Sequence, residues 1–166
     1  NQKTVDQSPV EKLIATGIVI RIAEKAKESR NYQLSIQDIL EWEKENGGIA
    51  ENSILLVDTG SSKLWPDREQ YMGTDERGKG AVVKLKFPGI HPDAARYLAE
   101  KRRIKAVGID TPSIDFGGSK EFNTHRMLFD KDITGMENVD NLDQLPRKCF
   151  MIFALPMNIK GGNGVS

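Results

Sequence analysis

Cysteine and net charge are both nearly absent from this chain of 166 residues. Its one cysteine, Cys149, rules out a disulfide within the chain, and the surrounding apolar run CFMIFALPM predicts a buried, unreactive thiol. Lys and Arg number 24, as do Asp and Glu, and the longest basic run, 101–103, is typical of a solvated helix end. This balance argues against a nucleic-acid partner or an anionic membrane surface. No apolar run reaches the length of a membrane span.

Several familiar catalytic signatures are also missing. The serines within 58–65 lack the flanking glycines of a nucleophile elbow. The glycine pairs of the chain lack the spacing of a phosphate loop or a dinucleotide fingerprint. Internal repeats and low-complexity tracts are absent, and the length suits one domain.

Strand-like and helix-like segments alternate along the chain, which predicts an α/β layered domain. One helix is predicted to begin after Ser35, with Asp38 completing an acidic capping box, and to end at the glycines 47–48. A second begins at Pro92, with His91 capping it. Strands are predicted within 13–23, from about Thr16, and at 53–60, 81–90, 105–110 and 149–159.

Two segments between these elements are rich in polar residues. Residues 61–80 read as a long loop containing Trp65, and loops of this length are often functional. The run GIDTPSID places Asp110, Thr111, Ser113 and Asp115 just past a strand, where α/β sheets often carry their sites. The alternative is that these side chains only cap a tight turn by local hydrogen bonds, and the residues alone leave both interpretations open.

His125 is one of only two histidines, and it follows Thr124, a good helix N-cap residue. An early position in a helix would hold its ring rigidly. A lone histidine is nevertheless more often structural than catalytic. Glu137 lies twelve residues further on, and no local metal motif has that spacing.

A set of segments, taken in order along the chain, carries a more specific signal than any single motif. They are TVDQSPVEKLI, GIVIRI, DILEWEKENGGIAENSILLVDTG, FPGIHPDAARYLAEKR, VGIDTPSID, THRMLF, GMENVDNLDQLP and FALPMNIKGGNG. In this order they resemble the cyclase-like, metal-dependent hydrolases, which include bacterial kynurenine formamidase and isatin hydrolase. The resemblance implies that residues 1–166 form a single domain of the swivelling β/β/α sandwich fold. It also implies that the first part of that domain, and its end, lie outside this chain.

The resemblance also implies a metal site. In that family a histidine in an HRxL context and a glutamate before a VxNLxxL segment bind the metal, and here these positions match His125 and Glu137. Such ligands suit Zn²⁺ or Mn²⁺. The positions expected near the metal or the substrate are Asp110, Thr111, Ser113 and Trp65, the last as a pocket wall or a subunit contact.

The strongest signature of the family, HxGTHxDxP, is expected upstream of Asn1, so no catalytic residue is expected within this chain. The implied activity is hydrolysis of an amide-type C–N bond, in an aryl formamide such as N-formylkynurenine of tryptophan catabolism or in a cyclic amide such as isatin. The alternative is a non-catalytic family member that acts as a binding or scaffold protein. We also expect a small-molecule substrate, a homodimer or larger homo-oligomer, and little activity from this segment alone. The compartment stays open, with the cytoplasm favoured.

Overall fold

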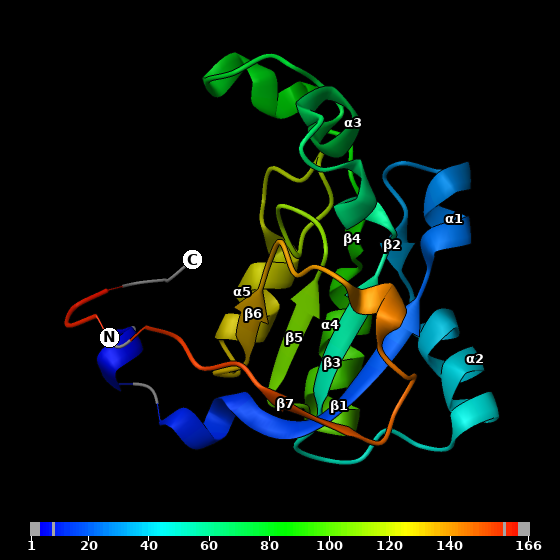
Figure 1. The fold of residues 1–166 in the computed structure, drawn as a ribbon, viewed down its shortest axis with the longest axis vertical. Coiled ribbons are helices and arrows are strands. Elements are labelled where there is room, and N and C mark those ends of the chain that lie inside the picture. Colours follow the sequence, from blue (N-terminus) through cyan, green and yellow to red (C-terminus); the bar gives the residue numbers. More distant parts are fainter. Residues whose placement is uncertain (1–3, 8, 158, 163–166) are drawn as a thin grey trace.

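The computed structural model describes residues 4–7, 9–157 and 159–162. Its centre is a five-stranded sheet in the order β6-β5-β3-β1-β7, in which only β7 runs antiparallel to its neighbour (Figure 1). The predicted α/β class is confirmed. The strands are β1 (Ile14–Arg21), β3 (Ile54–Asp58), β5 (Ala106–Ile109), β6 (Thr134–Met136) and β7 (Phe150–Phe153).

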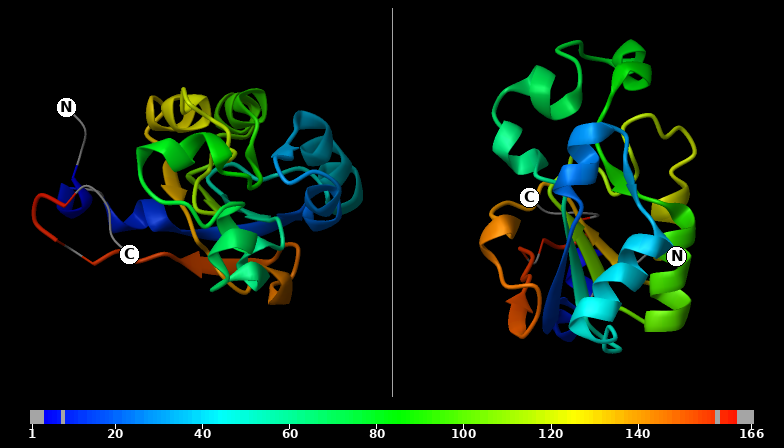
Figure 2. Two further views of the ribbon diagram at one scale, coloured as in Figure 1. Left: turned by 90° about the horizontal axis from the view of Figure 1, so that it is seen from above. Right: turned by 90° about the vertical axis from the view of Figure 1, so that its right-hand side faces the viewer.

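Three helices, α2 (Ile36–Asn46), α4 (Pro92–Tyr97) and α5 (Asn123–Phe129), cover one face of this sheet (Figure 2). Side chains from that face and from the helices form the larger apolar core, which includes Leu55, Val107 and Leu98. A smaller core on the opposite face packs Leu56 and Val19 against Leu142. Because both faces are covered, the central strand β3 is buried at every position. The helices are α1 (Ala23–Glu28), α2 (Ile36–Asn46), α3 (Arg68–Met72), α4 (Pro92–Tyr97) and α5 (Asn123–Phe129), and a π-helical turn, Leu98–Arg102, prolongs α4.

The ends of α2 agree with their sequence signals. Ser35 and Asp38 form the predicted capping box, and Gly47, at φ 85°, ends the helix. On this helix Ile39 is fully buried, whereas Leu40 is 43% exposed. The buried Trp42 fixes the helix to β1, since its indole N–H donates a hydrogen bond to the carbonyl of Val19 at 2.8 Å.

The strand predicted at 81–90 is largely wrong. Residues 79–84 form a 3₁₀ helix, and only β4 (Gly89–Ile90) pairs, in a separate two-stranded sheet with β2 (Gln33–Leu34). Val82 and Val83 are exposed, so the β-branched run has no neighbouring strand or core to stabilise it. The whole segment 61–86, which contains α3, extends beyond the carboxyl end of β3 (Figure 1).

The prediction of a buried Cys149 is also wrong. Cys149 is exposed and takes a left-handed backbone (φ 68°) at the entry to β7. β7 lies at the edge of the sheet, so its side chains alternate between core and surface. Phe150 and Ile152 pack on the smaller core, while Met151 and Phe153 are exposed. Within this chain the strand is therefore covered on one face only.

The described helices are all too short or too polar to cross a membrane.

Candidate functional site

Two neighbouring parallel strands carry the candidate residues to one edge of the sheet. β5 pairs with β6, with Gly108 opposite Met136. The loop that follows β5 and the residue that follows β6, Glu137, therefore leave the sheet at the same carboxyl edge. Helix α5 lies between these two strands in the chain and packs on α4.

His125 is held at the start of α5 by a residue of the β5 loop. The carboxylate of Asp115 accepts hydrogen bonds from the backbone N–H groups of Thr124 (3.1 Å) and His125 (3.2 Å), and the ring Nδ1 of His125 lies 2.5 Å from it. The predicted capping role of Thr124 is wrong. Thr124 lies inside the helix, and its hydroxyl donates to the carbonyl of Ile90 at 2.6 Å. The N-terminus of α5 is thus satisfied by a carboxylate from the loop that leads from β5 into the helix.

The other ring nitrogen of His125 faces Glu137. The distance from Nε2 to the Glu137 Oε1 is 3.0 Å, and the same oxygen accepts a 3.0 Å hydrogen bond from the backbone N–H of Ile114. The two side chains that we expected to converge therefore do so. Their side chains are 22% and 32% exposed, so the pair is accessible at the surface.

These carboxylates control the protonation of His125. Burial by itself lowers the pKa of the imidazole, but Asp115 and Glu137 outweigh it and raise the pKa to about 9. Burial acts to raise the pKa of Asp115, yet the hydrogen bonds from His125 and the helix N-terminus hold it below its usual value. At neutral pH the metal-free ring is therefore a cation between two carboxylates.

An imidazole nitrogen and a carboxylate oxygen 3.0 Å apart are suitable donors for a divalent metal ion. Asp115 supplies the carboxylate that metal-binding histidines commonly contact through their other nitrogen. The donor set is nevertheless short. Among the described residues there is no group of three or more His, Cys, Asp or Glu side chains that could hold an ion. The pair fits part of a metal site.

The hydrogen-bond partners of the Asp110 carboxylate lie on the loop after β3, whereas the side chains of Thr111 and Ser113 bond within their own turn. Asp110 is buried, and its carboxylate accepts from the N–H and hydroxyl of Thr59 and from the N–H of Ser62. Burial raises its pKa although these bonds oppose the shift. The Thr111 hydroxyl donates to the Ser113 carbonyl at 2.8 Å. Asp110 thus joins the ends of β3 and β5, while the other two stabilise the turn that carries Asp115.

Trp65 lies beyond this network. It is 67% exposed and meets the ring of Tyr71 edge-on, with 5.7 Å between centroids. The Tyr71 hydroxyl lies 2.9 Å from the side-chain oxygen of Asn138, the residue after Glu137. The loop 61–86 is therefore connected to the site through Tyr71.

The sequence predicts the surroundings of His125 only in part. Asp115 is a candidate at the end of the run GIDTPSID, but nothing in the sequence indicates its contact with His125, ten residues further on. Phe122 and Phe129 both meet the imidazole edge-on, at centroid distances of 5.9 and 5.3 Å, and both are about half exposed. A phenylalanine on each side of a helical histidine is a usable signal, since the spacings of three and four place all three on one helical face.

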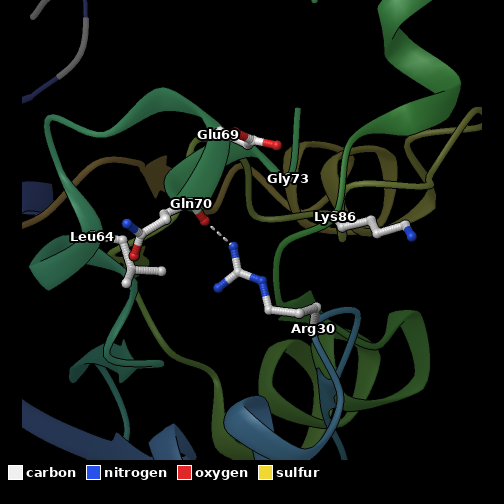
Figure 3. Close-up of a pocket in the computed structure, with 6 residues that line it drawn as sticks. All are labelled: Arg30, Leu64, Glu69, Gln70, Gly73 and Lys86. Carbon is white, nitrogen blue, oxygen red and sulfur yellow. Dashed lines mark hydrogen bonds between the residues drawn. The ribbon is translucent and has the colours of Figure 1, made fainter. Parts of the chain in front are cut away.

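One surface hollow lies apart from this pair. It has a volume of about 390 Å³, and neither His125 nor Glu137 lines it. Arg30 points into it and donates a hydrogen bond to the Gln70 carbonyl (Figure 3). The lining residues come from the end of α1 and the loop 61–86; they are Arg30, Leu64, Glu69, Gln70, Gly73 and Lys86.

Comparison with known proteins identifies related chains. The Cyclase family model matches residues 1–116. An isatin hydrolase of Roseibium aggregatum is 28% identical over 163 residues, which cover 96% of this chain and 59% of that protein. A kynurenine formamidase of Bacillus cereus is 34% identical over 91 residues, covering 55% of this chain and 43% of that protein.

Solved structures agree with these matches. Isatin hydrolase A from Labrenzia aggregata, bound to benzyl benzoate, superposes with a TM-score of 0.87 at 30% identity, over 98% of this chain and 62% of that one. An isatin hydrolase bound to the product analogue thioisatinate gives a TM-score of 0.88 at 27% identity, over 98% of this chain and 61% of that one. The present chain therefore spans about three fifths of the length of these isatin hydrolases.

Proposed function

We propose that this chain, which belongs to the Cyclase family, carries part of the active site of a metal-dependent hydrolase that cleaves an amide-type C–N bond. The observation that carries the proposal is the convergence of His125 Nε2 and Glu137 Oε1 to 3.0 Å at the carboxyl edge of the sheet. The relatives named isatin hydrolase and kynurenine formamidase support the reaction class.

In this proposal His125 and Glu137 hold a Zn²⁺ or Mn²⁺ ion together with ligands from another segment, because catalytic sites commonly use three protein ligands. When bound, the ion polarises the amide carbonyl and lowers the pKa of water toward neutrality. His125 must lose the proton on Nε2 to bind the ion. Glu137 is kept in place meanwhile by the Ile114 N–H.

The side chains around the pair favour an aromatic substrate. Phe122 and Phe129 are about half exposed, and each contacts the imidazole. An aryl ring attached to the scissile amide could pack on these rings edge-on or stacked, as aromatic pairs prefer. We therefore propose an aryl formamide or a cyclic aryl amide as the substrate class.

The test uses the protein at the length its gene encodes. Purified protein should hydrolyse N-formylkynurenine or isatin, lose this activity on chelation, and regain it with added Zn²⁺ or Mn²⁺. His125→Ala and Glu137→Gln should each lower kcat/KM by at least about 100-fold if they remove metal ligands. His91→Ala is the matched control, because His91 is exposed and only caps α4.

Turnover that survives both substitutions would contradict the assignment of the pair. A full-length protein that binds metal but hydrolyses neither substrate class would favour the non-catalytic alternative. Residues 1–166 alone should bind metal weakly and show little turnover, since two donors are too few. Robust turnover by this segment, abolished in His125→Ala, would show that no further ligands are required.

A further inference from the structure

Two consecutive residues hold both members of the His125–Glu137 pair. The backbone N–H of Ile114 donates to Glu137, and the side chain of Asp115 contacts His125. Asp115 is nearly fully buried, with a side chain only 4% exposed. Its Oδ1 accepts from the Thr124 N–H and the Ser119 hydroxyl, and its Oδ2 is within hydrogen-bonding distance of the backbone N–H and the Nδ1 of His125.

These contacts restrict where a proton can sit on the ring. Both ring nitrogens face a carboxylate oxygen, Nδ1 at 2.5 Å from Asp115 and Nε2 at 3.0 Å from Glu137, and an ionised carboxylate only accepts hydrogen bonds. The Asp115 contact is the shorter one, and that side chain is 4% exposed against 32% for Glu137, so Asp115 holds the single proton of the neutral ring more strongly. In a neutral imidazole the other nitrogen then has the free lone pair, and the tautomer is set by the hydrogen bond that the first nitrogen makes. The free lone pair of His125 would lie on Nε2, which faces Glu137.

We propose that Asp115 is a positioning residue that fixes neutral His125 as the Nδ1–H tautomer and directs the Nε2 lone pair toward Glu137. The same carboxylate closes the N-terminus of α5, so the ring and the helix that carries it are oriented by one group. The identity of the group that Nε2 then binds rests on the proposed function. The tautomer is independent of that function, because it follows from contacts within this chain.

The second histidine, His91, provides an internal reference, because its contacts predict the opposite tautomer. His91 Nδ1 accepts a hydrogen bond from the backbone N–H of Asp93 at 3.1 Å. Its neutral form must therefore carry the proton on Nε2. Since the chain has only these two histidines, a single spectrum should contain one ring of each tautomer.

The experiment is ¹⁵N NMR of the metal-free chain labelled at histidine, recorded above the pKa of His125, at a pH of about 10.5. Circular dichroism at that pH confirms that the chain stays folded. We expect His125 to show a protonated Nδ1 and a bare Nε2, and His91 to show the reverse. Two rings with the same Nε2–H tautomer would overturn the proposal without any substitution.

Asp115→Ala tests whether the carboxylate is the cause. We expect the ratio of Nδ1–H to Nε2–H at His125 to fall at least about tenfold, because a charge-assisted hydrogen bond is lost. Asp110→Ala is the matched control, since it removes a second buried carboxylate at the same edge that does not contact His125. It should leave the ratio unchanged.

An unchanged tautomer in a folded Asp115→Ala chain would overturn the proposal. If that variant does not fold, Asp115→Asn replaces it. An amide there must place its NH₂ group against a backbone N–H of Thr124 or of His125, so the ratio should still change. A protein that hydrolyses neither substrate would contradict the proposed function, but the expected tautomer of His125 would be the same. Failure of the proposed function is therefore distinguishable from failure of this inference.

Discussion

Nε2 of His125 lies 3.0 Å from Oε1 of Glu137, although twelve residues separate them. Burial lowers the pKa of His125. The neighbouring carboxylates of Asp115 and Glu137 raise it and outweigh the effect of burial. We therefore expect Glu137→Gln to lower this pKa from about 9 toward the ordinary value of 6.5 in the metal-free chain. An NMR titration of the ring measures the change directly.

The matched control for this titration is Asp93→Asn, which removes the carboxylate beside His91 instead. It should leave the pKa of His125 unaltered. A His125 pKa that stays near 9 in Glu137→Gln would show that the two side chains are not in contact in solution.

Asp38 is expected to make the free energy of unfolding of the domain depend on pH in the acidic range. Burial raises its pKa, but hydrogen bonds from Lys25, Ser35 and Tyr32 together hold the pKa below its ordinary value of 3.8. The folded pKa is depressed, so the stabilisation is present above about pH 4 and is lost as the pH falls through the folded pKa. Asp38→Asn should reduce the free energy of unfolding at pH 7 by about 2 kcal/mol.

Urea denaturation at several pH values checks this expectation, and the difference from the wild type should shrink at low pH. Glu41→Gln is the control, because Glu41 also pairs with Lys25 but is exposed. Its effect should be much smaller. Equal effects from the two substitutions would mean that burial of Asp38 does not matter.

Gly89 sets the position of the loop that carries Asp115. A Cβ atom there would lie 2.3 Å from the backbone nitrogen of Phe116 and 2.6 Å from the carbonyl carbon of Asp115. Gly89→Ala should therefore destabilise the fold by about 1–3 kcal/mol and shift the NMR signals of His125. Gly80→Ala, where a Cβ meets nothing within 4 Å, should change stability by less than about 0.5 kcal/mol. Similar denaturation midpoints for both variants would contradict the close approach.

Trp65 tests the proposed assembly. We propose that the full-length protein is a homodimer or larger homo-oligomer and that Trp65 contributes to a subunit contact or a pocket wall, because an aromatic side chain 67% exposed is unusual. Trp65→Ala should weaken self-association or raise KM. Its cost in folding stability should stay near 1 kcal/mol, the value of an aromatic pair such as Trp65–Tyr71.

Sedimentation of the full-length protein at micromolar concentration measures the first effect. Val83→Ala is the control, since Val83 is exposed to a similar extent on the same loop. A monomeric wild type would contradict the assembly. If Trp65→Ala retains both its oligomeric state and its KM, Trp65 has neither role.

The sequence by itself determined the elements whose signals are local. The Ser35–Asp38 capping box and Gly47 set the ends of α2, and Pro92 after His91 set the start of α4. These two helices follow their local signals because a cap or a missing N–H acts within one turn of the helix. The capping signal of Thr124 failed because Asp115 bonds the N-terminus of α5 instead. The alternation of such elements was sufficient to predict the α/β class.

Only the tertiary structure decided the features that depend on distant neighbours. Residues 81–88 have strand-like composition but pair with no described strand, and Cys149 lies in an apolar run that reaches the sheet only at its edge strand. The resemblance to a family indicated His125 and Glu137, but their direct contact required the parallel pairing of β5 and β6. Such pairing joins residues far apart in the chain, and side-chain spacing along the sequence carries no record of it.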